Sequence, residues 1–463
     1  MKVNGCARCG QLVFFENTAC LRCGAPLGFD PGRGRVLTLV PDSPPAARPA
    51  DRDDGHGPAT VFYELPPVAE VGAALADGPV MGGPAIGRPD AVPGAGPAPD
   101  PIARDLLEAV PASRRRRYRR CANARLADCN WLTPVPTPAR CATEVAEVAG
   151  RPDASGTASS AEPASSGELC VCCRLTRTRP ADTDPVGKTQ FKRAEAAKRR
   201  LVAQLLELGL PVVSGVDDAA NGLAFDLLGS TEQKVMTGHS DGIITLDLAE
   251  SDDAHREMVR TQLGEPYRTL LGHFRHETGH YYWSSLVDAD PGRAEQFRDL
   301  FGDAGLDYSA AVDRHYAEGP PRNWGETHVS AYATMHPWED WAETFAHYLH
   351  IRDTLRTAAE FGLRVAGPDL DSFGVAPHSL AAEPADVAPF GMAGPDRSSP
   401  QLAEIVAQWL PLTYALNAIN RSMGRDDIYP FVLTPAVQAK LSFVHDVIAA
   451  GAGGAGAASE RTS

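Results

Sequence analysis

Two histidines and an intervening glutamate have the residue types and spacing of a hydrolytic metal site. They lie in the segment 265–287, where Pro266 and the pattern that follows it predict one long helix. His276 and His280 are one helical turn apart, so both imidazoles can reach a single zinc ion at about 2.0–2.1 Å. Glu277 can accept a proton from zinc-bound water, whose pKa the metal lowers towards about 7.

A catalytic zinc of this kind needs a third protein ligand, commonly from a later helix, and an open position for water. The segment 330–351 offers one: Pro337 suits a helix start, and Glu339 and Glu343 lie one turn apart on the same face. Glu339 can coordinate zinc, and Glu343 is placed to accept a hydrogen bond from a ligand histidine. Spacing alone leaves open which carboxylate does which.

The metal-site residues stand in three blocks of sequence. They are GEPYRTLLGHFRHETGHYYW (264–283), DYSAAVDRHYAEGPP (307–321) and SAYATMHPWEDWAETFAHYLH (330–350). Together they closely resemble bacterial zinc-binding metallopeptidases that carry an N-terminal zinc ribbon. The resemblance covers nearly the whole chain apart from two low-complexity stretches. It implies an α+β fold: a zincin- or gluzincin-like metallopeptidase domain, mainly helical with a small sheet, preceded by small zinc-ribbon modules.

More distantly, the pairing of the two-histidine motif with Tyr-x6-Glu is similar to gluzincins of the lethal-factor type. That resemblance makes Glu339 the third zinc ligand and gives Tyr332 a hydrogen bond to the oxyanion of the tetrahedral intermediate. In zincins an edge strand above the active-site helix binds the substrate backbone. Because apolar residues alternate along 242–248, we assign that role to this segment, and the implied substrate is an extended peptide.

Four cysteines near the N-terminus form two CxxC pairs, Cys6 with Cys9 and Cys20 with Cys23. This spacing is typical of a structural zinc site. Four thiolates leave no open position for water, so the site has no catalytic role. Metal binding here replaces the hydrophobic core that about 40 residues cannot build.

A second, less regular cysteine set predicts another structural zinc site. Its four members are Cys121, Cys129, Cys170 and Cys173, and the last precedes an Arg-Leu run as in the resembled family. Cys141 and Cys172 are left over. The alternative is that Cys172 replaces Cys170 as a ligand, or that this set holds no metal. The expected cofactors are therefore one catalytic zinc ion and one or two structural ones.

Composition divides the chain into five expected segments. They are a zinc ribbon (1–40), a flexible Pro/Gly/Ala-rich linker (41–112), a second cysteine-rich module (113–180) with a low-complexity insertion (134–168), the metallopeptidase domain (181–450) and a disordered tail (451–463).

A formal net charge of -15 disfavours nucleic acid and anionic membranes as partners, since both need a positive field. The N-terminus lacks a signal-like apolar run, and no segment offers about 18 uninterrupted apolar residues. We therefore expect a cytoplasmic protein.

The leading interpretation is a zinc metallopeptidase acting on a peptide or protein, with the ribbon modules positioning a substrate or partner. Two alternatives come from other classes. One is a zinc-dependent binding or regulatory protein with a dormant peptidase fold, in which the histidines and carboxylates are structural. The other is a nucleic-acid-binding regulator acting through the cysteine modules and the basic run 114–120.

Overall fold

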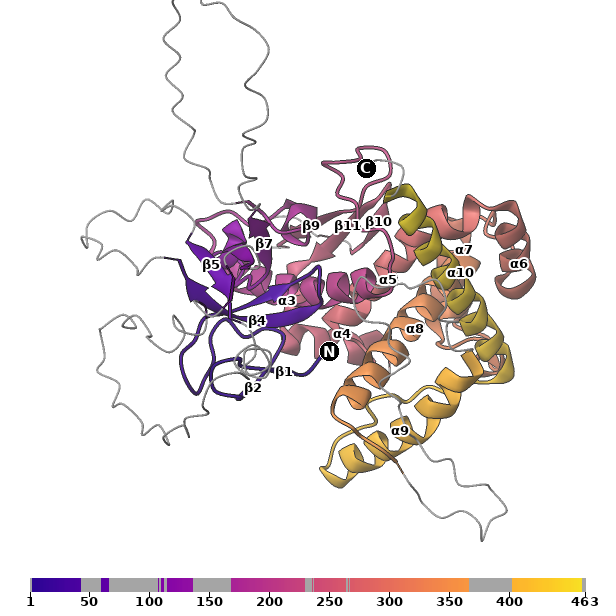
Figure 1. Cartoon of the computed structure of the whole chain (residues 1–463). Coiled ribbons are helices and arrows are strands. Elements are labelled where there is room, and N and C mark those ends of the chain that lie inside the picture. Colours follow the sequence, from indigo (N-terminus) through magenta and orange to yellow (C-terminus); the bar gives the residue numbers. More distant parts are fainter. Residues whose placement is uncertain are drawn as a thin grey trace, which may run out of the picture. The chain divides into compact units, whose positions relative to one another are not determined.

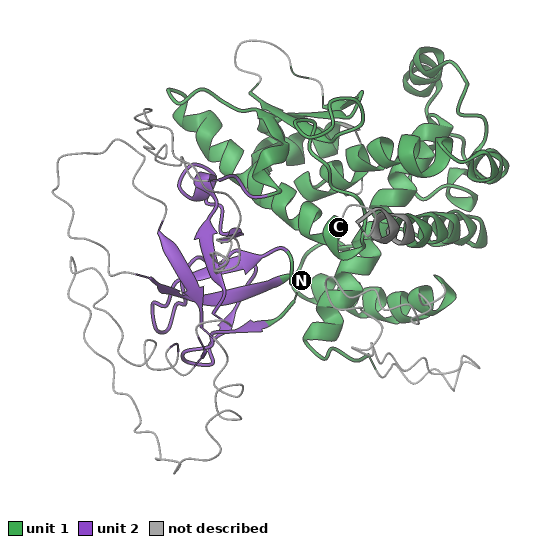
Figure 2. Ribbon diagram, turned by 45° about the horizontal axis from the view of Figure 1, so that its top comes forward, with its two compact units in different colours: residues 1–3, 32–34, 171–463 green, residues 4–31, 35–170 purple. Residues whose placement is uncertain are grey.

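The computed structural model divides the chain into two compact units (Figure 2). Unit 1 comprises Met1–Val3, Gly32–Gly34 and Val171–Ser463, and unit 2 comprises Asn4–Pro31 and Arg35–Cys170. The structure describes residues 2–42, 60–65, 107, 110–111, 115–135, 168–229, 235, 237–263, 265, 267–365 and 402–459. Most of the expected insertion 134–168 and most of the expected linker 41–112 lie outside these residues, although residues 134 and 135 belong to a strand.

Unit 2 is built from a short hairpin and a five-stranded antiparallel sheet of order β3-β4-β5-β6-β7 (Figure 1). The strands are β1 (Asn4–Gly5), β2 (Leu12–Val13), β3 (Leu27–Asp30), β4 (Arg35–Pro41), β5 (Val61–Glu64), β6 (Arg117–Arg120) and β7 (Leu132–Val135), with the 3-10 turn η2 (Ala122–Ala124). Its buried core is Leu37, Leu39, Phe62, Tyr118 and Leu132. Apolar side chains from four strands therefore hold the sheet together.

Strand β5 differs from the sequence expectation, because it lies inside the predicted linker 41–112. It pairs with β4 on one side and β6 on the other, so the expected ribbon and the second cysteine module share one sheet. Val61-Phe62-Tyr63 is a β-branched and aromatic run with strong strand propensity. The residues around this run are rich in Pro, Gly and Ala. Their composition predicted a linker, so the short strand was not recognised.

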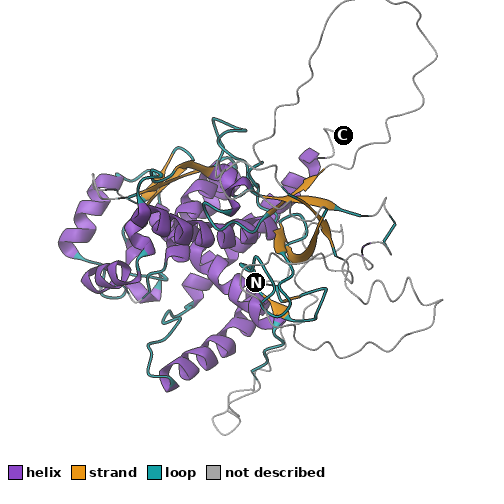
Figure 3. Ribbon diagram, turned by 90° about the vertical axis from the view of Figure 1, so that its left-hand side faces the viewer, coloured by secondary structure: helices purple, strands orange, loops and turns teal. Residues whose placement is uncertain are grey.

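Unit 1 is α+β and mainly helical (Figure 3). Its helices are α3 (Pro185–Glu207), α4 (Asp253–Leu263), α5 (Leu270–Trp283), α6 (Pro291–Phe301), α7 (Tyr308–Glu318), α8 (Pro337–Glu360), α9 (Leu402–Ser422) and α10 (Pro435–Ser459). The short 3-10 helices of this unit are η3 (Cys173–Leu175), η4 (Leu248–Ser251), η6 (Trp324–Glu326) and η7 (Tyr332–Thr334), and η5 (Ser284–Asp288) is a π-helix. Helix α10 continues to Ser459, so the expectation that the tail is disordered from residue 451 differs from the structure.

A four-stranded sheet of order β10-β11-β9-β8 lies in the same unit. The strands are β8 (Thr176–Thr178), β9 (Ala224–Leu228), β10 (Gly238–Ser240) and β11 (Ile243–Asp247). The expectation that 242–248 forms the edge strand is wrong: β11 pairs with β9 in parallel and with β10 antiparallel. Asp241 and Gly242 have φ of 48° and 78° and form the tight turn of this hairpin. The edge strands of this sheet, in the described part of the chain, are β10 and β8.

The helices α5 and α8 are placed by caps and by a close crossing. Helix α5 begins at Leu270, later than the predicted start near Pro266, because the Thr269 hydroxyl accepts a hydrogen bond from Gly272 N at 3.0 Å. A Cβ added at Gly279 would lie 3.1 Å from Ala342 Cα, so a larger residue would require α5 and α8 to shift by a few tenths of an ångström. Trp341 Nε1 donates a 2.8 Å hydrogen bond to the Gly279 carbonyl, which stabilises the crossing of the two helices.

Candidate metal centre

The crossing of α5 and α8 brings His276, His280 and Glu339 together. The distance from His276 Nε2 to Glu339 Oε2 is 3.0 Å, and the distance to His280 Nε2 is 3.2 Å. His280 Nε2 is 3.4 Å from Glu339 Oε1. Ligand atoms on a tetrahedral zinc ion with bonds of about 2.0–2.1 Å lie roughly 3.3 Å apart. The donor set therefore fits one zinc ion, with three protein ligands converging on it among the described residues.

Burial makes this cluster costly unless a cation is held there. Glu339 is 2% exposed and His280 is 4% exposed, while 12% of the His276 side chain is exposed. Nitrogen atoms of the two imidazoles face each other beside the Glu339 carboxylate, and all three groups are largely buried. Buried polar groups without a partner cost free energy. A divalent cation between them satisfies all three groups at once.

Glu343 lies behind His276 and orients it. Its Oε1 accepts a 2.8 Å hydrogen bond from His276 Nδ1, which leaves Nε2 turned towards Glu339. Ser330 Oγ donates a 2.6 Å hydrogen bond to the other oxygen, Oε2. Burial opposes ionisation of Glu343, but these hydrogen bonds outweigh it and lower its pKa to about 2. The structure thus separates the two carboxylates that helical spacing left ambiguous.

Replacing Glu343 with glutamine should weaken the catalytic zinc site about 10- to 100-fold, because the imidazole of His276 loses its anionic partner. Competition with a chromogenic chelator measures this affinity. Glu404→Gln, an exposed position on α9, is the matched control and should leave it unchanged. Wild-type affinity in the Glu343→Gln protein would contradict this role.

Glu277 is buried beside the first histidine, at 9% exposure. Burial raises its pKa above the usual range for a glutamate, and the neighbouring imidazoles of His276 and His280 act in the opposite direction. A carboxylate with a raised pKa is a stronger base than an exposed one. This property suits a group that takes a proton near neutral pH.

Two tyrosines lie next to the ligand set. The ring centroid of Tyr332, on η7, is 5.9 Å from that of His276. Tyr308, the first residue of α7, donates a 2.9 Å hydrogen bond from its hydroxyl to Glu339 Oε1. Burial and the Glu339 carboxylate raise the pKa of both phenols, so both stay protonated at neutral pH. Tyr332 was predicted from the gluzincin resemblance and remains a prediction, whereas Tyr308 and Ser330 were not predicted, because no spacing rule connects them to the site.

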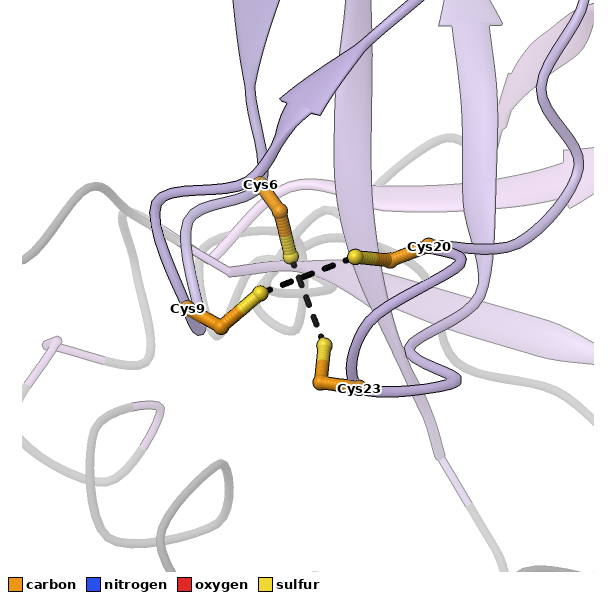
Figure 4. Close-up of side chains that lie close together, drawn as sticks. All are labelled: Cys6, Cys9, Cys20 and Cys23. Carbon is orange, nitrogen blue, oxygen red and sulfur yellow. Dashed lines mark hydrogen bonds between the residues drawn. The ribbon is translucent and has the colours of Figure 1, made fainter. Parts of the chain in front are cut away.

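The first cysteine set comes together as the two CxxC turns of unit 2 (Figure 4). Cys6 Sγ and Cys23 Sγ are 3.6 Å apart, as are Cys9 Sγ and Cys20 Sγ. Thiolates on a tetrahedral zinc ion with bonds of about 2.3 Å lie roughly 3.8 Å apart. The four sulfurs therefore fit a closed zinc site.

Three members of the second cysteine set, Cys121, Cys129 and Cys170, lie in unit 2, and Cys173 belongs to unit 1. The Sγ atoms of Cys129 and Cys170 are 3.7 Å apart. Cys172 is fully buried but does not belong to the set, and Cys141 lies outside the described residues. The geometry favours Cys170 over Cys172 as a ligand.

Cys170→Ala should therefore lose about one zinc ion per chain, whereas Cys172→Ala should keep the wild-type content. Elemental analysis of the purified proteins measures the difference, since a site with three thiolates binds zinc far more weakly than one with four. The opposite result, with zinc lost only from Cys172→Ala, would restore the alternative ligand set.

Two arginines of the basic run, Arg115 and Arg120, donate hydrogen bonds within unit 2. Arg120 donates to the carbonyls of Thr18 and Leu27 at 2.9 and 3.1 Å, and Arg115 Nε donates to Val110 O at 2.8 Å. Guanidinium groups committed to backbone oxygens contribute less to a phosphate-binding surface. No helix among the described residues is long and apolar enough to cross a membrane.

Comparison with known proteins agrees with this donor chemistry. Residues 187–447 match the family described as "Putative zinc-binding metallo-peptidase", and residues 3–56 match a zinc-ribbon domain. Uncharacterised proteins of Mycobacterium bovis and Mycobacterium tuberculosis are 40% identical over 443 residues, which cover 96% of this chain and 94% of theirs. No solved structure matches.

Proposed function

Because the chain belongs to the family of zinc-binding metallopeptidases, we propose that it hydrolyses peptide bonds in a protein or peptide substrate. The observation that carries the proposal is the convergence of His276, His280 and Glu339 within 4.8 Å, with Glu277 beside them. Three protein ligands are the number that leaves a position for water. The order of these residues along the chain also supports a gluzincin-like arrangement.

When bound, zinc supplies Lewis acidity and lowers the pKa of water towards about 7. Glu277 takes the proton of the attacking water and later returns it to the amine nitrogen that leaves. The phenol of Tyr332, held protonated, donates a hydrogen bond to the carbonyl oxygen as negative charge develops on it. Glu343 keeps His276 in the tautomer that presents Nε2.

The strand that binds the peptide backbone is β10 in this proposal, because β11 is paired on both sides. An extended substrate would add to the sheet at the β10 edge. His239 in this strand has its ring centroid 6.4 Å from that of His280, so the edge lies close to the metal ligands. The cysteine-bound zinc modules would then hold a protein substrate or partner.

Reduced thiol sets of this kind favour the cytoplasm as the place of action. The alternatives are a binding or regulatory protein with a dormant site, and a nucleic-acid-binding regulator.

Incubating the zinc-loaded protein with a peptide library and analysing the products by mass spectrometry tests the proposal. Cleavage that a chelator abolishes and zinc restores would support a peptidase. A fully zinc-loaded protein that cleaves nothing would favour the dormant scaffold.

A further inference from the structure

A tyrosine outside both metal-binding helices contacts the carboxylate ligand. The Tyr308 hydroxyl lies 2.9 Å from Glu339 Oε1, and Oε2 of the same carboxylate is the atom 3.0 Å from His276 Nε2. We propose that Tyr308 is a positioning residue that holds Glu339 as a one-oxygen zinc ligand and thereby sets the metal affinity of the site. The inference rests on the proposed function, since it assumes that Glu339 coordinates zinc.

The position of this hydroxyl is fixed by contacts on several sides. Asp307 caps α7 by accepting a hydrogen bond from Ala310 N, which holds the first turn of the helix that carries Tyr308. The Tyr308 ring packs edge-on against His336 and Trp338, with centroid distances of 5.4 and 6.2 Å. Tyr308 is 40% exposed, and these contacts restrict the rotation of its ring, which lowers the entropy cost of its hydrogen bond to Glu339.

The loop before α7 is tied to the start of α8. His336 accepts a hydrogen bond from Trp338 N through Nδ1, and its Nε2 donates to the Leu306 carbonyl at 3.1 Å. Glu339 lies in the first turn of α8, three residues after His336. The same histidine therefore holds both the helix that presents the ligand and the loop that presents the phenol.

The hydrogen bond has a defined consequence for the carboxylate. A phenol that donates to Oε1 draws negative charge to that oxygen, which lies 3.4 Å from His280 Nε2, and leaves Oε2 to face His276 Nε2 at 3.0 Å. Without the hydroxyl, Glu339 can rotate or offer both oxygens, and the three donors are no longer held at the spacing zinc requires. Partners of metal ligands typically change affinity or activity by about 10- to 100-fold when removed.

Tyr308→Phe isolates this effect because it removes only the hydroxyl and keeps the ring contacts. Zinc affinity of the full-length protein is measured by competition with a chelator, together with the absorption spectrum of the cobalt-substituted catalytic site. Tyr316→Phe is the matched control, because Tyr316 lies on the same helix and is 67% exposed. The expected result is a 10- to 100-fold weaker catalytic site in Tyr308→Phe alone.

A shifted cobalt spectrum with an unchanged melting temperature of the zinc-free protein supports a role at the metal, since a merely structural residue would alter the melting temperature instead. Wild-type affinity and spectrum in Tyr308→Phe, or equal losses in Tyr316→Phe, overturn the inference and leave the proposed function standing. A wild-type protein that binds no zinc at His276, His280 and Glu339 overturns both.

Discussion

The Glu277→Gln protein is expected to cleave peptides with kcat/KM about 100- to 10,000-fold below wild type, the range that a general base contributes. Glutamine has nearly the same shape as glutamate but cannot accept the proton of the attacking water. Glu277 is not one of the three residues that we propose as zinc ligands, so the zinc content of the Glu277→Gln protein should stay unchanged. Initial rates on a substrate identified from the peptide library, with elemental analysis of the same sample, measure both quantities.

The control for this substitution is Glu295→Gln, an exposed glutamate on α6. It removes the same charge away from the ligands and should leave kcat/KM within experimental error of wild type. If Glu277→Gln holds a full complement of zinc and cleaves as fast as wild type, Glu277 is not the base. A protein that had lost its zinc would instead point to an unexpected structural role for this carboxylate in the metal centre.

Local spacing was enough to nominate His276, His280 and the pair Glu339 and Glu343 as candidates, because a helix places positions four apart on one face. It could not separate the roles of Glu339 and Glu343. That distinction depends on the point along each helix at which α5 and α8 cross. The close approach of the two helices at Gly279 sets this point. A packing contact between residues far apart in sequence has no periodic signature, so it emerges only from the folded chain.

The strands show the same limit. The segment 242–248 was identified as a strand from its alternation, but its place in the sheet depends on pairing partners. The edge strand β10 has only three residues, Gly238–Ser240, with no apolar pattern. The Asp241-Gly242 turn was a usable signal, since Asp-Gly favours a two-residue hairpin. Strand β5 is likewise stabilised by β4 and β6, which lie on opposite sides of the expected linker.

Tyr308 illustrates a third kind of miss. It is separated from Glu339 by 31 positions, and its contact arises because the loop before α7 is fastened to the α8 N-terminus through His336. Helix-start rules account for Asp307 as the cap of α7. They say nothing about where the first residue of that helix points. Residues that support a ligand from another element are therefore the least accessible part of such a site to sequence analysis.

The His276→Ala/His280→Ala double variant is expected to lose one zinc ion per chain. The wild-type protein should hold three zinc ions per chain, one for each of the three donor sets, and the double variant should hold two. Removing both imidazoles leaves a single carboxylate, Glu339, which cannot retain zinc through purification. The cysteine sets keep their thiolates, so the structural metal should stay bound. Elemental analysis normalised to protein concentration gives the stoichiometry directly.

A matched double variant separates this loss from a general effect of removing histidines. His255 and His315 belong to none of the three donor sets, so His255→Ala/His315→Ala should still hold three zinc ions. Loss of one zinc in both double variants would make the change non-specific. An unchanged content in His276→Ala/His280→Ala would mean that these histidines hold no zinc in the purified protein. That result would favour a regulatory protein whose zinc is bound by cysteine alone, because hydrolysis in our proposal requires a zinc ion held by His276, His280 and Glu339.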